Sequence, residues 1–170
     1  MSQYTPTSGT ITQIDWLDTD PRQPGCGLLY TFSSFDQGTI QMAVDGSTYV
    51  VDGRPLNVGD QVTFFYPLDG PVPLIYPPRY QAAAAVHTPC GTYATLDIFT
   101  QSPMNGQLTN EDDTLRLNLS RRTWMTLPNG QPFGGALSGK LLLVLYGATT
   151  RSIPAQTTPD RIIVFCPSDT

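Results

Sequence analysis

The stretch that comes nearest to a known catalytic pattern is GGALSGKL, residues 134–141, which almost matches the phosphate-binding loop G-x-x-x-x-G-K-[ST]. That loop needs a hydroxyl after the lysine to reach Mg²⁺, and here Leu141 stands in its place. It also needs a helix whose N-terminus holds the phosphate, whereas KLLLVLY, residues 140–146, is typical of a strand. We therefore expect a glycine-rich turn here and no nucleotide cofactor.

Histidine and cysteine chemistry is equally sparse. The sole histidine, His87, lies near Cys90, and no G-x-S-x-G motif offers a serine nucleophile. Cys26, Cys90 and Cys166 are too far apart for a CxxC metal site, so a closed zinc site would need all three and His87 to converge. Two interpretations of the thiols stay open. They are idle or buried, or Cys26, Cys90 and Cys166 are candidates for inter-chain disulfides.

The acidic residues form two clusters, one of Asp15, Asp18 and Asp20 and one at residues 111–113. Neither has the Asp-x-Asp-x-Asp-Gly spacing of a calcium loop, so solvated turn carboxylates are expected. With no nucleophile–base pair and no metal-ligand set, we expect that the chain is not an enzyme and that it binds no metal or cofactor.

Composition excludes further classes of function. The 170 residues carry a net charge of −5, and only 14% are charged. Nucleic acids and anionic membrane surfaces are bound through excess Lys and Arg, so neither is an expected partner. The sequence contains no run of 18 apolar residues, so no membrane insertion is expected. The start, MSQYTPTSGT, lacks the basic and apolar regions of a signal peptide, so we expect synthesis in the cytoplasm.

The elements that carry these residues are expected to be strands. Helix formers are few, Thr, Val, Ile and aromatic residues are many, and no segment has a convincing 3.6-residue period. The run QAAAAV, residues 81–86, is short and follows two prolines, so it too is assigned to a strand. The expected strands are about 9–17, 28–34, 39–44, 47–52, 60–66 and 80–87, then 92–99, 114–119, 122–127, 140–146 and 161–166.

The two halves of the chain repeat the same blocks in the same order. The pairs are SGTITQIDWL with CGTYATLDIF, IQMAV with LRLNL, STYVVDGRPL with RTWMTLPNGQPF, QVTFFY with LLLVLY, and QAAAAV with RIIVF. This order indicates a tandem duplication. We predict a flexible N-terminal tail at 1–7, a first β-barrel repeat at 8–89 and a second at 90–167. Each is an all-β barrel of five to six strands, OB-like as first choice and SH3-like or a sandwich as second.

A proline-rich segment joins the last two strands of each half, PVPLIYPPRY at 71–80 and the stretch around SIP in the second. Proline fixes φ and removes a donor, so these segments are stiff loops. They could plug a barrel end or face outward as a contact surface. The candidate interaction surface consists of Tyr4, Leu74, Ile75, Tyr76, Arg79, Arg151 and Ile153.

Two longer segments carry a resemblance. PVPLIYPPRYQA and TTRSIPAQTTPDRIIVFC, with the V-G-D-x-V turn at 58–62, resemble small, poorly characterised two-repeat β proteins of anaerobic spore-forming Firmicutes. The resemblance implies a bacterial origin and brings no activity with it. In a spore former, a protein without a signal peptide can reach the spore surface when the mother cell lyses.

Two functions of different class follow from these features. The first is a non-catalytic structural subunit that self-assembles into a homo-oligomer, fibre or coat at a spore or cell surface. Low charge, apolar proline loops and unpaired cysteines favour it. The second is an OB-like module that binds a glycan, a peptide or another small polymer through aromatic residues expected in strands: Trp16, Tyr49, Phe64, Tyr66, Trp124 and Tyr146.

Overall fold

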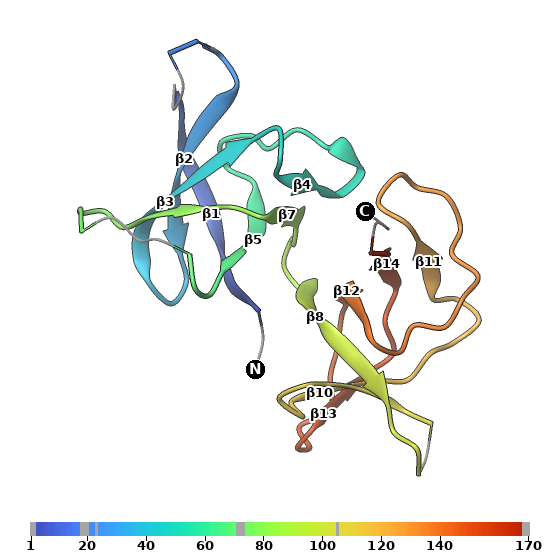
Figure 1. Ribbon diagram of the computed structural model, residues 1–170. Coiled ribbons are helices and arrows are strands. Elements are labelled where there is room, and N and C mark those ends of the chain that lie inside the picture. Colours follow the sequence, from blue (N-terminus) through green and yellow to red (C-terminus); the bar gives the residue numbers. More distant parts are fainter. Residues whose placement is uncertain (1–2, 18–20, 23, 71–73, 105, 168–170) are drawn as a thin grey trace. The chain divides into compact units, whose positions relative to one another are not determined.

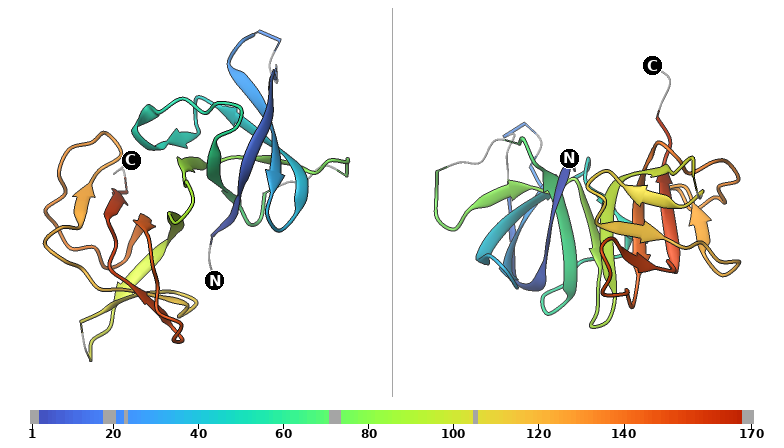
Figure 2. Two further views of the ribbon diagram at one scale, coloured as in Figure 1. Left: turned by 180° about the vertical axis from the view of Figure 1, so that it is seen from behind. Right: turned by 90° about the horizontal axis from the view of Figure 1, so that it is seen from below.

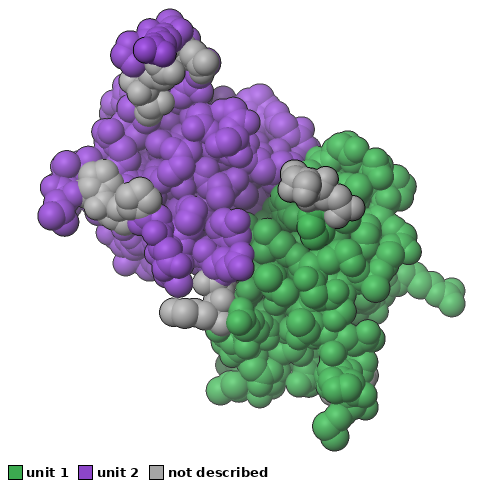
Figure 3. Space-filling view, viewed as in Figure 1, with its two compact units in different colours: residues 1–2, 91–170 green, residues 3–90 purple. Residues whose placement is uncertain are grey.

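The computed structural model describes residues 3–17, 21–22, 24–70, 74–104 and 106–167. The chain divides into two compact units, one spanning Gln3–Cys90 and the other beginning at Gly91 (Figure 3). We call them the first and second repeat and describe each by itself. No helix in the described part of the chain has the length and apolar character needed to cross a membrane.

The described part of the first repeat forms a seven-stranded mixed sheet with one short 3-10 turn, η1, at Val51–Gly53. Its strands are β1 (Tyr4–Trp16), β2 (Gly27–Ser34), β3 (Gly38–Asp45), β4 (Tyr49–Val50), β5 (Gln61–Pro67), β6 (Arg79–Gln81) and β7 (Ala84–His87) (Figure 1).

The described part of the second repeat forms another seven-stranded mixed sheet. Its strands are β8 (Tyr93–Gln101), β9 (Leu108–Asn110), β10 (Leu115–Leu117), β11 (Trp124–Thr126), β12 (Lys140–Tyr146), β13 (Ala155–Thr157) and β14 (Arg161–Phe165).

The two sheets have the same strand order. The first runs β4-β7-β5-β1-β2-β3-β6 and the second runs β11-β14-β12-β8-β9-β10-β13. Each strand of one repeat therefore has a counterpart at the same place in the other. The matched sequence blocks occupy these counterpart strands, for example QVTFFY in β5 and LLLVLY in β12. The all-β fold is confirmed, and the equal topology is consistent with tandem duplication.

The first strand is long because it serves two partners. β1, dark blue in Figures 1 and 2, pairs with β5 through residues 4–10 and with β2 through residues 9–16. A bulge between Ile11 and Gln13 shifts the register where the partners change. At Gly9 a side chain would meet the Ser33 carbonyl oxygen at 2.0 Å, so only glycine allows the chains to approach this closely.

The last segment of the repeat divides its pairing in the same way. β6 runs parallel to β3, and β7 runs antiparallel to β5. The change takes place between two neighbouring residues. The Ala82 N–H donates to the Ala43 carbonyl of β3 at 2.9 Å, and the Ala83 N–H donates to the Phe65 carbonyl of β5 at 2.7 Å. The strand predicted at 80–87 is therefore divided into β6 and β7, with a bend at Ala83 between them, and the alanine run is not helical.

Apolar side chains from these strands form one core in each repeat. In the first, Phe32, Ile40, Met42, Val62 and Phe64 are all fully buried. In the second, Phe99, Leu142, Val144, Ile162 and Val164 take this role. β5 and β14, each paired with a strand on both sides, bury four consecutive side chains each, which explains their mostly apolar sequences.

The structure differs from the sequence-based expectation in several places. Residues 4–7, predicted as flexible tail, are paired with β5 because they continue the alternating pattern of β1. Residues 51–53 turn instead of continuing the strand predicted at 47–52. β9 and β13 were not predicted, since three-residue strands have too few residues to show a period. Among the described residues no strand pairing joins β4 to β6 or β11 to β13, so each sheet is open at both ends of its strand order. The predicted closed barrel is therefore not found in the described part of the chain.

The core makes a simple stability prediction. The Phe64 ring is fully buried and meets the Phe32 ring edge-on at 5.1 Å between centroids. Replacing Phe64 by Ala should lower the free energy of unfolding by about 3–5 kcal/mol, because the cavity cannot fully collapse. Urea denaturation followed by circular dichroism measures this loss. Phe35→Ala is the matched control, since Phe35 is 73% exposed and should cost under about 0.5 kcal/mol. Equal losses at both positions would contradict the assigned core.

Candidate interaction surface

Residues 68–78, which we call the first proline loop, leave the end of β5 and enter β6. Residues 71–73 of it lie outside the described part. The loop extends away from the strands in Figure 1, where it is green, and stands out from the first repeat in Figure 3. Leu74 and Tyr76 are 104% and 88% exposed, and Ile75 is 48% exposed. These three side chains therefore do not plug the core of their repeat.

Residues 147–154, the second proline loop, occupy the counterpart position between β12 and β13. Ile153 is 95% exposed, and Arg151 is exposed as well. Hydrogen bonds close the loop at its base, because the Thr150 N–H donates to the Gln156 carbonyl at 2.9 Å and the Gln156 N–H donates to Thr150 Oγ1 at 2.9 Å. Each loop ends in a cis peptide bond, Tyr76–Pro77 in the first and Ile153–Pro154 in the second.

Tyrosines lie at the foot of both loops. Tyr66 at the end of β5 stacks on Tyr80 of β6 with 4.2 Å between ring centroids, and Gln37 lies within hydrogen-bond distance of both hydroxyls. Burial raises the pKa of Tyr66 above its ordinary value. In the second repeat Tyr146 stacks on Tyr93 at 6.0 Å. The first stack joins β5, which the first proline loop leaves, to β6, which it enters. The second stack joins β12, which the second proline loop leaves, to the neighbouring strand β8.

Two predicted surface residues lie at the foot of the first loop instead of its tip. Tyr4 is half-buried in β1, opposite Pro67 of β5. Arg79 is half-buried at the start of β6, where its Nη2 donates to Gln41 Oε1 at 3.3 Å. The interaction surface predicted from the sequence thus separates into exposed tips and partly buried supports.

All three cysteines are free and exposed. Cys26 lies just before β2, Cys90 ends the first repeat, and Cys166 follows β14. Exposed thiols can meet a thiol of a second chain, so the inter-chain disulfides predicted at these positions stay a prediction.

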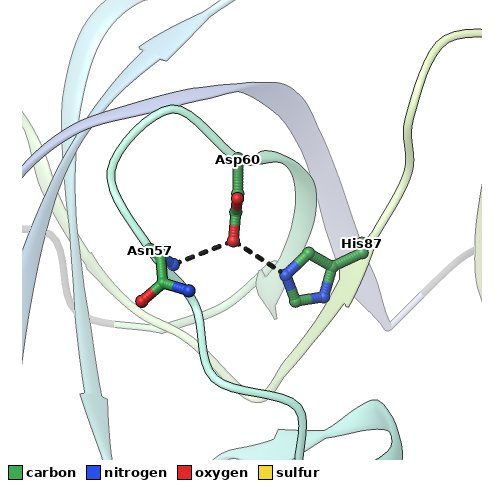
Figure 4. Close-up of polar contacts among 3 residues, drawn as sticks. All are labelled: Asn57, Asp60 and His87. Carbon is green, nitrogen blue, oxygen red and sulfur yellow. Dashed lines mark hydrogen bonds and ion pairs between the residues drawn. The ribbon is translucent and has the colours of Figure 1, made fainter.

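His87 has a structural partner. Its Nε2 lies 3.0 Å from Asp60 Oδ2, and the Asn57 N–H donates to the same carboxylate oxygen at 2.9 Å (Figure 4). The Asn57 N–H, followed by His87, holds the pKa of Asp60 below its ordinary value. The carboxylate fastens the Asn57–Asp60 turn to the end of β7. Cys90, which the sequence offered as a partner of His87, is free and exposed.

The glycine-rich stretch that resembles a phosphate-binding loop also has a structural role. Residues 134–139 form a turn and loop before β12, as expected, and the Lys140 ammonium donates back to the Ala136 carbonyl at 2.6 Å. In the described part of the chain, no group of three or more His, Cys, Asp or Glu could hold a metal ion. Asp18 and Asp20 of the first acidic cluster lie outside the described residues.

Sequence reasoning missed one buried carboxyl group, Asp97 of β8, which is 4% exposed. Its Oδ1 accepts the Ile98 N–H at 2.8 Å, and its Oδ2 lies 3.4 Å from Asn110 Nδ2. Burial raises the pKa of Asp97, and these hydrogen bonds offset part of the rise. Asn110 Oδ1 in turn accepts the N–H groups of Thr114 and Leu115, so the pair ties β8 to the β9–β10 turn.

The aromatic residues expected in strands divide into two groups. Phe64 belongs to the core, whereas Trp16 and Trp124 are 71% and 54% exposed. The Arg161 guanidinium lies over the Trp124 ring, 4.3 Å from its centroid, which fixes that indole against the sheet. The two tryptophans are therefore the accessible aromatic faces among the six.

The hollows of the second repeat were not predicted from the sequence. An apolar pocket of about 230 Å³ is lined mainly by Leu108, Leu119, Met125 and Leu137, with Gln101 and Ser138 as polar members. A groove of about 490 Å³ is lined partly by residues 147–150 of the second proline loop itself, together with Asn118, Gln156 and Asp160 among others. Both are built from loops and strand ends far apart in the sequence, so no local pattern could reveal them.

No protein-family model matches the chain, and no curated protein matches it. The resemblance to two-repeat proteins of spore-forming Firmicutes is therefore left as a prediction.

The Asp60 contacts predict a pH dependence. The pKa of Asp60 in the folded chain lies below the ordinary aspartate value of about 3.9, so its stabilisation is complete above that pH and is lost as the pH falls through the folded value. Asp60→Asn should destabilise by its full amount above about pH 3.9, and the difference should shrink as the pH falls from that value through the lower folded pKa. Urea unfolding of both proteins between pH 7 and about pH 2 measures this difference. A constant difference over that range would show that the charge of Asp60 does not contribute.

Proposed function

We propose that this chain is a non-catalytic structural subunit that associates with further copies of itself through its proline loops. One observation carries the proposal: counterpart loops of the two repeats present the nearly fully exposed apolar side chains Leu74, Tyr76 and Ile153. A tip that served only its own repeat would gain by burying these side chains. Apolar residues in water at duplicated positions are what a contact surface requires.

The energetics of such a contact are favourable. Burying one large apolar side chain contributes about 1.5–3 kcal/mol. Proline restricts the first loop, and hydrogen bonds close the second, so little conformational entropy remains to be lost on contact. With 14% charged residues, repulsion between copies is also weak.

We further propose that each repeat is an OB-like barrel. The support is the divided pairing of its last segment, since β6 bonds to β3 while β7 bonds to β5. If residues 79–87 count as one strand, the order becomes that of a five-stranded barrel, with this strand between β3 and β5. β13 and β14 divide between β10 and β12 in the same manner.

A spore or cell surface is the place we propose for the assembly. It rests on the resemblance to proteins of spore-forming Firmicutes. An assembly of low charge with exposed thiols suits a coat or fibre, because oxidation outside the cell would cross-link neighbouring copies.

Self-association can be tested by light scattering after size-exclusion chromatography. The wild-type chain should form oligomers whose mass rises with concentration above the 18.5 kDa of one copy. Tyr76→Ser should weaken association roughly thirtyfold, the loss expected when a buried anchor is removed. Ile153→Ser tests the second loop in the same way.

Two controls sharpen this measurement. Met104→Ser removes an apolar side chain that is 94% exposed on a different loop, so it should leave association unchanged. Repeating the experiment with reductant separates disulfide-linked oligomers from those held by the loops alone. A wild-type chain that stays monomeric at every concentration, with and without reductant, would refute the proposal.

A binding module for a glycan or peptide is a second candidate. In OB folds the loop between the fourth and fifth strands helps to grip an oligomeric ligand, and the first proline loop has that place in chain order. The exposed indoles of Trp16 and Trp124 supply stacking faces.

Tryptophan emission tests this second candidate. A glycan or peptide that stacks on Trp16 should shift or quench the emission of the full chain, and Trp16→Phe should remove most of that change. Trp124→Phe is the matched variant on the other repeat. Unchanged emission across soluble glycan and peptide panels would contradict this function.

A further inference from the structure

We infer that the apolar pocket of the second repeat is the receptor for the first proline loop of another copy, with Tyr76 as the inserted side chain. This inference rests on the proposed self-association and specifies which surfaces meet. Contacts between two different surfaces of one chain are heterologous and continue from copy to copy. The expected product is therefore a ring or an open chain of subunits, depending on the rotation between neighbouring copies.

The pocket has the right size and chemistry. Its volume of about 230 Å³ exceeds the roughly 150 Å³ of an engineered cavity that accepts benzene, so a phenol ring can enter. Leu108, Leu119 and Leu137 provide aliphatic walls, and the Met125 thioether is a favourable neighbour for an aromatic ring.

The polar members of the pocket suit the other end of tyrosine. Gln101 and Ser138 are part of its lining. The Ser138 hydroxyl oxygen already accepts the Gln101 N–H at 2.8 Å, and its own proton can be donated to a phenol oxygen. Tyrosine joins an apolar ring to a polar tip, which explains why we choose Tyr76 above Leu74 as the anchor.

Charge selects this pairing over a contact between two first repeats. Residues 1–90 hold eight Asp against three Arg, a net charge of −5, while residues 91–170 are neutral. Two first repeats therefore repel each other, whereas a first and a second repeat do not. Opposite charges also lie near the two surfaces. The Asp69 carboxylate is exposed on the first proline loop, and the Lys140 ammonium lies beside the pocket, where it donates to the carbonyl of the lining residue Ala136.

The test uses two variants that each disable one partner surface. Tyr76→Ser removes the anchor but keeps the pocket, and Leu119→Asp places a carboxylate in the pocket lining at a residue that is 46% exposed. Each variant alone should associate roughly thirtyfold more weakly than the wild type, so that light scattering finds it mainly monomeric at concentrations where the wild type forms oligomers. Mixed in equal amounts they should form a dimer of two chains, because one intact pocket and one intact loop remain.

Controls address folding and charge. The far-UV circular dichroism spectra and urea unfolding curves of Tyr76→Ser and Leu119→Asp should match those of the wild-type chain. Ala136→Glu is a second variant of the pocket, at an exposed position. Val58→Asp introduces the same charge at a 59% exposed residue of the first repeat and should leave association intact. Tyr76→Phe keeps the ring and should weaken association less than Tyr76→Ser.

The outcomes separate the two proposals. Restored dimers in the mixture support the head-to-tail contact. If both folded pocket variants associate like the wild type while Tyr76→Ser is monomeric, the loop has another receptor and this inference is wrong, although the proposed function survives. If the wild-type chain is monomeric, or if Tyr76→Ser and Ile153→Ser both associate normally, the proposed function itself is wrong.

Discussion

The divided pairing of the last segment in each repeat is the constraint on which the rest of the structure depends. Ala82 and Ala83 are neighbours, yet their N–H groups donate to β3 and β5, which lie three positions apart in the sheet order. A buried backbone N–H without an acceptor is costly, so each residue of this segment is held where an acceptor exists. The sheet must curve for both acceptors to be within reach.

This curvature explains several local features of the sequence. β1 can pair with β5 and with β2 only because a bulge and Gly9 let it bend. The side chains at the crossing are small: Ala82, Ala84 and Ala85 are buried, and larger residues would separate the strands. In the second repeat the change of partner strand takes place at Asp160, whose N–H donates to the Leu145 carbonyl of β12.

The same constraint determines where the proline loops begin and end. A segment that must enter beside β3 after leaving β5 has to cross one end of the sheet, and it cannot use proline N–H groups to pair on the way. Prolines in this crossing therefore cost no ladder hydrogen bonds. The tyrosine stacks lie at the foot of each loop, and the apolar side chains at the tips are exposed.

The ionisable groups of the molecule serve this architecture. His87 and Asp60 fasten a turn to β7, and Asp97 with Asn110 ties β8 to the next turn. Arg161 supports Trp124 instead of facing an open site.

The all-β class, the duplication and most strand positions could be predicted from the sequence, because alternation and repeated blocks are local signals. QVTFFY and LLLVLY, for instance, are strands wherever their neighbours lie. The exposure of Leu74, Tyr76 and Ile153 could not be predicted, since the same apolar residues would suit a buried plug. The pocket around Leu119 and Met125, the burial of Asp97 and the short strands β9 and β13 were likewise decided by tertiary structure. Each depends on which distant segments meet, and in a sheet whose neighbours are far apart in the chain, local patterns do not contain that information.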